Sequence, residues 1–89
     1  MTTSNTTLTF IRKPTVLARL GLSKSAFYER LNMGLLPPPI ALGNRAVGWI
    51  EHEINIVLNA MATGISDGEL ITLIQQLIAK RKQNLKALL

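Results

Sequence analysis

The chain has 89 residues, of which 47% are hydrophobic, so it can form one small domain with its own core. Ten Lys and Arg residues against five Asp and Glu residues give a formal net charge of +5, which favours nucleic acid, ahead of an anionic membrane surface, as a partner. The chain contains no cysteine, which excludes disulfides, thiolate catalysis and Cys-ligated zinc, and which is typical of a cytoplasmic protein.

The first nine residues are rich in Ser, Thr and Asn and lack the basic and apolar regions of a secretory signal. We expect residues 1–9 to form a disordered N-terminal arm. No run of residues approaches the roughly 18 consecutive apolar positions of a transmembrane helix. We therefore expect no membrane partner.

Two short helices joined by a tight turn are predicted next. Pro14 can occupy the first turn of a helix, whose apolar face continues until Gly21 ends it. The turn Gly21-Leu22-Ser23 follows, and Ser23 can cap a second helix over residues 24–33. This order of helix, three-residue turn and capped helix is typical of a helix-turn-helix that offers its second helix to the DNA major groove.

The second helix has a predicted buried side and a predicted exposed side. At about 100° per residue, the apolar residues fall on one side, and these are Ala26, Phe27, Leu31 and Met33. The opposite side is polar and carries Ser25, Tyr28, Glu29 and Asn32. We expect the polar side to face a partner.

A small hairpin is predicted after the helix pair. Three successive prolines exclude a helix over residues 35–39, so this segment should be an extended connection. Residues 40–42 and 45–49 are expected to be strands around a turn at Gly43-Asn44, which gives a hairpin with a basic tip and the length of a wing. Trp49, between Val47 and Ile50, is expected to lie in the core and not to stack on a base.

Two further helices complete the predicted fold. One should run from Ile50 to near Gly64. Ser66 and Glu69 have the S-x-x-E spacing of a capping box, which places the start of the last helix there. The apolar stripe of this last helix consists of Leu70, Ile71, Ile74, Leu77, Ile78, Leu85 and Leu88.

That stripe can either fold back on the preceding domain or pair with another copy of the chain. A single small module buries only roughly 600–1,000 Å² on DNA, which favours a partner. We therefore expect residues 10–63 to form the DNA-binding domain and residues 64–89 to form an amphipathic helix that supports a homo-oligomer or cooperative assembly. The expected self-association residues are Leu70, Ile74, Leu77 and Ile78.

No enzymatic or metal site is predicted. His52 is the single histidine, and position 56, where an H-E-x-x-H zinc motif needs its second histidine, is isoleucine. Glu51 and Glu53 point to different faces of a helix, and the dipole of the helix N-terminus accounts for both. We therefore predict a protein without catalytic residues, cofactor, metal or small-molecule substrate.

Several stretches of the chain resemble the AlpA-type prophage regulators. They are residues 10–17, 21–28 and 37–42 and, most specifically, the L-G-x-R-A-V-G-W stretch over residues 42–49. The resemblance covers residues 10–58 and, more loosely, 64–78. It implies a mainly α-helical winged helix-turn-helix, related to MerR-like and excisionase folds, that acts on the DNA of mobile elements.

The pattern and the resemblance together predict the DNA contacts. The expected DNA-binding residues are Arg12, Lys13, Ser23, Lys24, Ser25, Tyr28, Glu29, Asn44 and Arg45. Lys24 and Tyr28 should bind phosphates, whereas Ser25 and Glu29 should reach base edges in the major groove. The hairpin should enter the minor groove. Arg19 is expected to contact the DNA backbone, as are Arg12 and Lys13.

Three functions follow from this reading. The first is a sequence-specific regulator of transcription that binds double-stranded DNA in a prophage or integrative mobile element. The second is an excisionase-like recombination directionality factor that bends attachment-site DNA. The third is a protein-interaction module that acts through the C-terminal helix.

Overall fold

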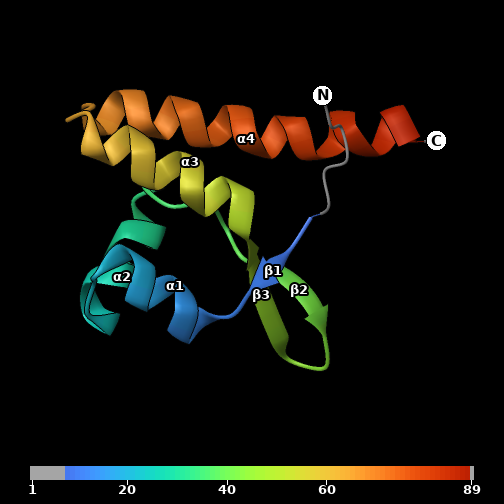
Figure 1. Ribbon diagram of the computed structural model, residues 1–89, viewed down its shortest axis with the longest axis horizontal. Helices are drawn as coiled ribbons and strands as arrows, with labels where there is room; N and C mark the ends of the chain where they lie inside the picture. Colours follow the sequence, from blue (N-terminus) through green and yellow to red (C-terminus); the bar gives the residue numbers. More distant parts are fainter. Residues whose placement is uncertain (1–7, 89) are drawn as a thin grey trace.

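A computed structural model describes residues 8–88, without the side chain of Leu88. The chain forms four helices and a small sheet (Figure 1). In chain order the elements are β1 (Phe10–Ile11), α1 (Lys13–Leu20), α2 (Lys24–Asn32), β2 (Ile40–Gly43), β3 (Ala46–Ile50), α3 (Glu51–Ala62) and α4 (Asp67–Leu88). The predicted winged helix-turn-helix with an additional C-terminal helix is therefore confirmed.

The sheet has a strand that the sequence did not predict. Its order is β1-β3-β2 with antiparallel pairing, and Ile11 of β1 lies opposite Trp49 of β3. The carbonyl of Thr9 accepts a hydrogen bond from the Glu51 N–H at 2.8 Å. Thr9 therefore belongs to the folded unit and not to the expected arm, whose residues 1–7 lie outside the described part of the chain. A strand of two residues is too short to show an alternating pattern, which is why it was missed.

The turn between α1 and α2 confirms the predicted helix-turn-helix. Gly21 has a φ of 67° and ends α1, and the hydroxyl of Ser23 accepts a hydrogen bond from the Ala26 N–H at 3.2 Å. Phe27 is fully buried, as predicted, but Met33 is 55% exposed, and its predicted burial was wrong. Six residues after Phe27, Met33 lies about 120° away around the helix axis.

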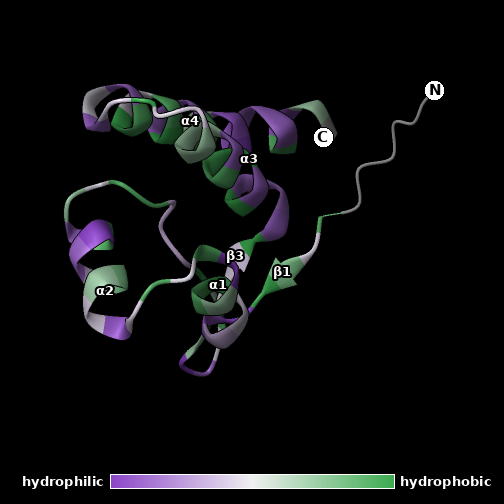
Figure 2. Cartoon of the chain, turned by 60° about the vertical axis from the view of Figure 1, so that its left-hand side comes forward, coloured by the Kyte–Doolittle hydropathy of each residue, from purple (hydrophilic) through white to green (hydrophobic). Residues whose placement is uncertain are grey.

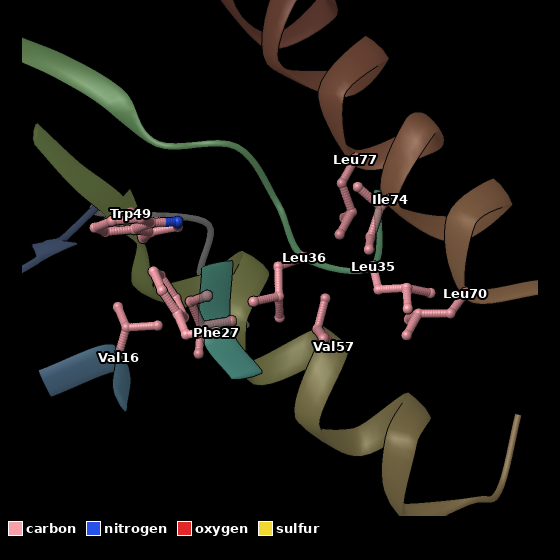
Figure 3. Close-up of a cluster of buried hydrophobic side chains, with 10 residues drawn as sticks. Val16, Phe27, Leu35, Leu36, Trp49, Val57, Leu70, Ile74 and Leu77 are labelled. Carbon is pink, nitrogen blue, oxygen red and sulfur yellow. The ribbon is translucent and has the colours of Figure 1, made fainter. Parts of the chain in front are cut away.

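One core joins the four helices, β1, β3 and the segment that follows α2 (Figure 3). Trp49 lies in it, as predicted, with its indole Nε1 donating to the Pro37 carbonyl at 3.0 Å and its ring 5.4 Å from that of Phe27. Edge-to-face contact of the two rings connects α2 to the sheet. The buried residues of this core are Val16, Phe27, Leu35, Leu36, Trp49, Ile54, Val57, Leu70, Ile74 and Leu77.

Helix α4 packs on its own chain. The capping box is confirmed, because the Ser66 hydroxyl accepts from the Glu69 N–H and the Glu69 carboxylate accepts from the Ser66 N–H, both at 3.2 Å. Figure 1 shows α4 alongside α3. Of the expected self-association residues, Leu70, Ile74 and Leu77 are buried in the common core, and Ile78 packs against it.

Three of these four side chains are therefore buried within a single chain, and self-association of the protein stays a prediction. The physical reason is that α1, α2 and the sheet are too small to bury their own apolar faces, and α4 supplies the missing surface. The expected boundary after residue 63 does not separate two cores, since buried residues on both sides of it are packed together.

Gly48 allows β1 and β2 to approach β3 closely, and this gives a first prediction. A Cβ atom at Gly48 would lie 2.9 Å from Leu42 Cδ1 and 3.4 Å from both the Ile11 carbonyl oxygen and Phe10 Cβ. We expect Gly48→Ala to lower the free energy of unfolding by about 1 kcal/mol in urea denaturation, because the end of the Leu42 side chain must move. Gly68→Ala is the matched control, because a Cβ at Gly68 in α4 would meet nothing within 4 Å and should stabilise the helix slightly. Equal stabilities of the two variants would contradict the close approach.

Candidate nucleic-acid interface

Helices α1 and α2 meet at Lys13 and Tyr28. The Lys13 ammonium donates a hydrogen bond to the Tyr28 hydroxyl and lies 4.9 Å from the centre of the tyrosine ring. Tyr28 is 45% exposed, so the pair lies at the surface. The contact places two of the predicted phosphate ligands, 15 residues apart in the sequence, on one continuous surface.

The polar side of α2 is exposed along its length. Lys24, Ser25 and Glu29 are exposed, and within the described residues Lys24 and Glu29 form no ion pair. Ser23 is also exposed, and its hydroxyl caps α2. Figure 2 shows hydrophilic residues in purple on α2 and at the tip of the wing. The predicted face of α2 is thus open to solvent, opposite the buried Phe27.

Charge at the helix N-termini differs between the two halves of the fold. Helices α3 and α4 have acidic residues in their first turns, which the helix dipole favours. Helices α1 and α2 have none there, and instead begin at Lys13 and Lys24. A basic first turn adds to the positive end of the helix dipole, so these two N-termini attract anions such as phosphates.

The wing tip carries Asn44 and Arg45. Both residues are exposed and have positive φ angles, 34° and 66°, as a two-residue type I′ turn requires. Because Arg45 belongs to the turn, β3 begins at Ala46, one residue later than expected. Glycine is the usual residue at the Arg45 position of such a turn, so the arginine is held at a conformational cost. In both ribbon views the wing, α1 and α2 lie on the side of the molecule away from α4 (Figures 1 and 2).

Arg19 forms intrachain contacts that the sequence did not predict. Its guanidinium lies 2.6 Å from a Glu51 carboxylate oxygen and donates to Asn55 Oδ1 at 2.9 Å. These contacts tie α1 to the first turns of α3. The charge of Arg19 is therefore compensated within the chain. A residue that contacts the DNA backbone, as we expected of Arg19, would have its charge free.

A second ion pair, between Glu53 and Arg81, was also missed. Glu53 is 4% exposed, and the Arg81 Nε and Nη2 atoms donate to its two carboxylate oxygens at 2.8 and 2.5 Å. Arg81 Nη2 also donates to the Pro38 carbonyl at 3.1 Å. The helix dipole accounts for the position of Glu53 in the first turn of α3, but the partner lies 28 residues away, so spacing carried no signal of it.

Among residues 8–88, no group of three or more His, Cys, Asp and Glu side chains is placed to hold a metal ion. No helix of the described chain combines the length and apolarity needed to cross a bilayer.

The chain is similar in sequence to known proteins. The family described as prophage CP4-57 regulatory protein (AlpA) matches residues 9–56, which run from the residue before β1 into α3. ORF88, an uncharacterised protein of Enterobacteria phage P4, is 34% identical over 59 residues, or 66% of this chain and 67% of the phage protein. No solved structure matches the chain significantly. With more than half of its length matched, the chain belongs to the AlpA family of prophage regulatory proteins.

Proposed function

We propose that this protein is a sequence-specific regulator of transcription that binds double-stranded DNA in a prophage or integrative mobile element. The observation that carries the proposal is the position of the exposed polar face of α2 and the basic wing tip on one side of the molecule. Residues 1–45, which include both, contain six Lys and Arg residues against Glu29 alone, a net charge of +5. Membership of a family of prophage regulatory proteins supports the regulatory role.

In the proposed complex α2 lies in the major groove and the wing in an adjacent minor groove. Lys24 and the paired Lys13 and Tyr28 contact phosphates and fix the register of the protein on the duplex. Ser25 and Glu29 reach base edges, where the Glu29 carboxylate accepts from a cytosine amino group.

Four further residues support this placement. Arg12 extends the basic surface at the start of α1, where it is exposed. Asn44 and Arg45 enter the minor groove, and a narrow A·T tract would strengthen the attraction of the arginine. Ser23 holds the N-terminus of α2 in the orientation that this contact needs.

Selection of bound fragments from random duplexes, followed by salt titration of the selected site, tests the proposal. We expect a consensus sequence and an affinity that falls linearly with the logarithm of salt concentration. An affinity for the selected duplex no greater than that for random duplex or for heparin would refute sequence-specific binding.

Two alanine variants separate phosphate contacts from base contacts. Lys24→Ala should weaken binding to all duplexes and lower the salt slope by about one, because one phosphate contact is lost. Glu29→Ala should change the preference at one base pair in a second round of selection. Lys82→Ala is the charge control, since it removes the same charge from an exposed position on α4. The division of roles fails if Lys24→Ala and Glu29→Ala weaken all duplexes equally.

Arg45→Gly should separate stability from binding. Glycine adopts a φ near 66° without the steric cost of a side chain, so we expect the free energy of unfolding to rise by about 1 kcal/mol. The same change removes the cation from the wing tip and should weaken binding to the selected duplex. Asn44→Gly is the control, because asparagine tolerates positive φ well. Unchanged DNA affinity of the Arg45→Gly protein would exclude a minor-groove role.

A further inference from the structure

The segment that leads into the wing is held from two sides. Residues 37–39 are prolines, which have no N–H groups and therefore cannot donate to a neighbouring backbone. The Pro37 carbonyl instead accepts from the Trp49 indole at 3.0 Å, and the Pro38 carbonyl accepts from Arg81 Nη2 at 3.1 Å. Successive carbonyls are thus bound by side chains of β3 and α4, immediately before β2 begins at Ile40.

Arg81 is itself held in place by a buried carboxylate. Its guanidinium binds both oxygens of Glu53, and the Arg81 side chain is 21% exposed while that of Glu53 is 6% exposed. A two-point contact between planar groups fixes the orientation of the guanidinium as well as its position. One side chain therefore connects α3, α4 and the proline segment.

We propose that Arg81, oriented by Glu53, is a positioning residue that sets the direction of the wing relative to α2. From Pro38 the chain enters β2, which pairs with β3 up to the turn that carries Arg45. Helix α2 is fixed relative to the same strands, because Phe27 of α2 contacts Trp49 of β3. The inference rests on the proposed function, since it concerns how α2 and the wing reach two grooves at once. A wing held in one direction presents Arg45 at a high effective concentration once α2 is bound.

A charge-neutral double substitution tests this role. Glu53→Met/Arg81→Met removes the donor to Pro38 but leaves the net charge unchanged, and apolar replacement of a buried ion pair is often tolerated. The matched control is Arg19→Met/Glu51→Met, which removes the exposed ion pair between α1 and α3 without touching the proline segment. Arg81→Lys is a second test variant, because a single ammonium keeps the charge beside Glu53 but lacks the fork that reaches both partners.

Arg45→Ala is then measured in each background with the selected duplex. We expect an affinity loss of about tenfold in the wild type and in the control background, and less than about threefold in the Glu53→Met/Arg81→Met background. Lys13→Ala should cost the same in the wild type and in the Glu53→Met/Arg81→Met background, because its contact lies on α1 and α2 and not on the wing. An undiminished loss for Arg45→Ala without the buried pair would overturn the proposal, and so would an equal reduction in the control background.

Amide hydrogen exchange of the free protein provides a readout that needs no DNA. We expect faster exchange in β2, and a shifted proton resonance of the Trp49 indole N–H, when Arg81 is replaced and not when Arg19 is replaced. Unchanged exchange and an unchanged indole resonance would overturn the positioning role. A wild type that prefers no duplex would refute the proposed function, while the exchange data would still decide whether Arg81 holds the wing.

Discussion

Truncation after Thr63 is expected to unfold the protein and not to release an independent DNA-binding domain. The truncated chain lacks Leu70, Ile74 and Leu77, whose side chains are buried against the other core residues. Each buried aliphatic side chain contributes about 1.5–3 kcal/mol, so the three together contribute about 5–9 kcal/mol. Small domains have a total stability of about 5–15 kcal/mol. Circular dichroism during thermal and urea denaturation should show the loss of the cooperative transition.

A second truncation controls for the length of chain removed. Ending the chain after Lys82 keeps the buried residues of α4 and Arg81, and removes a stretch whose described side chains, in residues 83–87, are exposed. This shorter protein should retain the cooperative transition. Cooperative unfolding of the chain that ends at Thr63, together with undiminished DNA binding, would show that α4 is not needed for the core.

Arg81→Met is expected to be the most destabilising single substitution of a charged residue among those considered. It leaves the carboxylate of Glu53, whose side chain is 6% exposed, without its cation and removes the donor to the Pro38 carbonyl. Removal of one partner from a buried ion pair costs about 3–5 kcal/mol. Urea denaturation of the wild type and the variant measures the change. The Glu53→Met/Arg81→Met protein should recover much of the loss, since no buried charge is then left unpaired.

Arg19→Met serves as the control for that substitution. The Arg19 side chain is 34% exposed and its partner Glu51 is 32% exposed, so solvent screens their attraction. Breaking such a pair should cost about 0–1 kcal/mol. If Arg81→Met were no more destabilising than Arg19→Met, the contact between Arg81 and Glu53 would contribute no more to stability than an exposed ion pair.

The interface was more accessible to sequence reasoning than the core. Exposed polar positions on α2 follow from the helical period once the cap at Ser23 is placed, and the wing tip follows from the Gly43-Asn44 turn signal. Several strand and helix limits differed by one residue, because terminal residues depend on single hydrogen bonds. Lys13 and Tyr28 were each predicted to bind phosphate, but their contact with one another was not predicted.

Contacts between segments that are distant in the sequence were not predicted. The apolar stripe on α4 can pack against a second copy of the chain or against the rest of its own chain, because either surface would remove its side chains from water. Charged residues raised the same difficulty. Glu51 and Glu53 both suit the first turn of a helix, yet one pairs at the surface with Arg19 and the other is buried with Arg81.

The amino-acid sequence by itself determined the helix-turn-helix, the hairpin, the capping box at Ser66 and the membership of the AlpA family. These features depend on residues within a few positions of one another, where hydrogen-bond geometry and helical period act directly. Only the tertiary structure decided that α4 completes the core, that β1 joins the sheet and that Arg81 reaches Glu53 and Pro38. Those outcomes depend on which distant surfaces exclude water together, and no spacing along the chain encodes that choice.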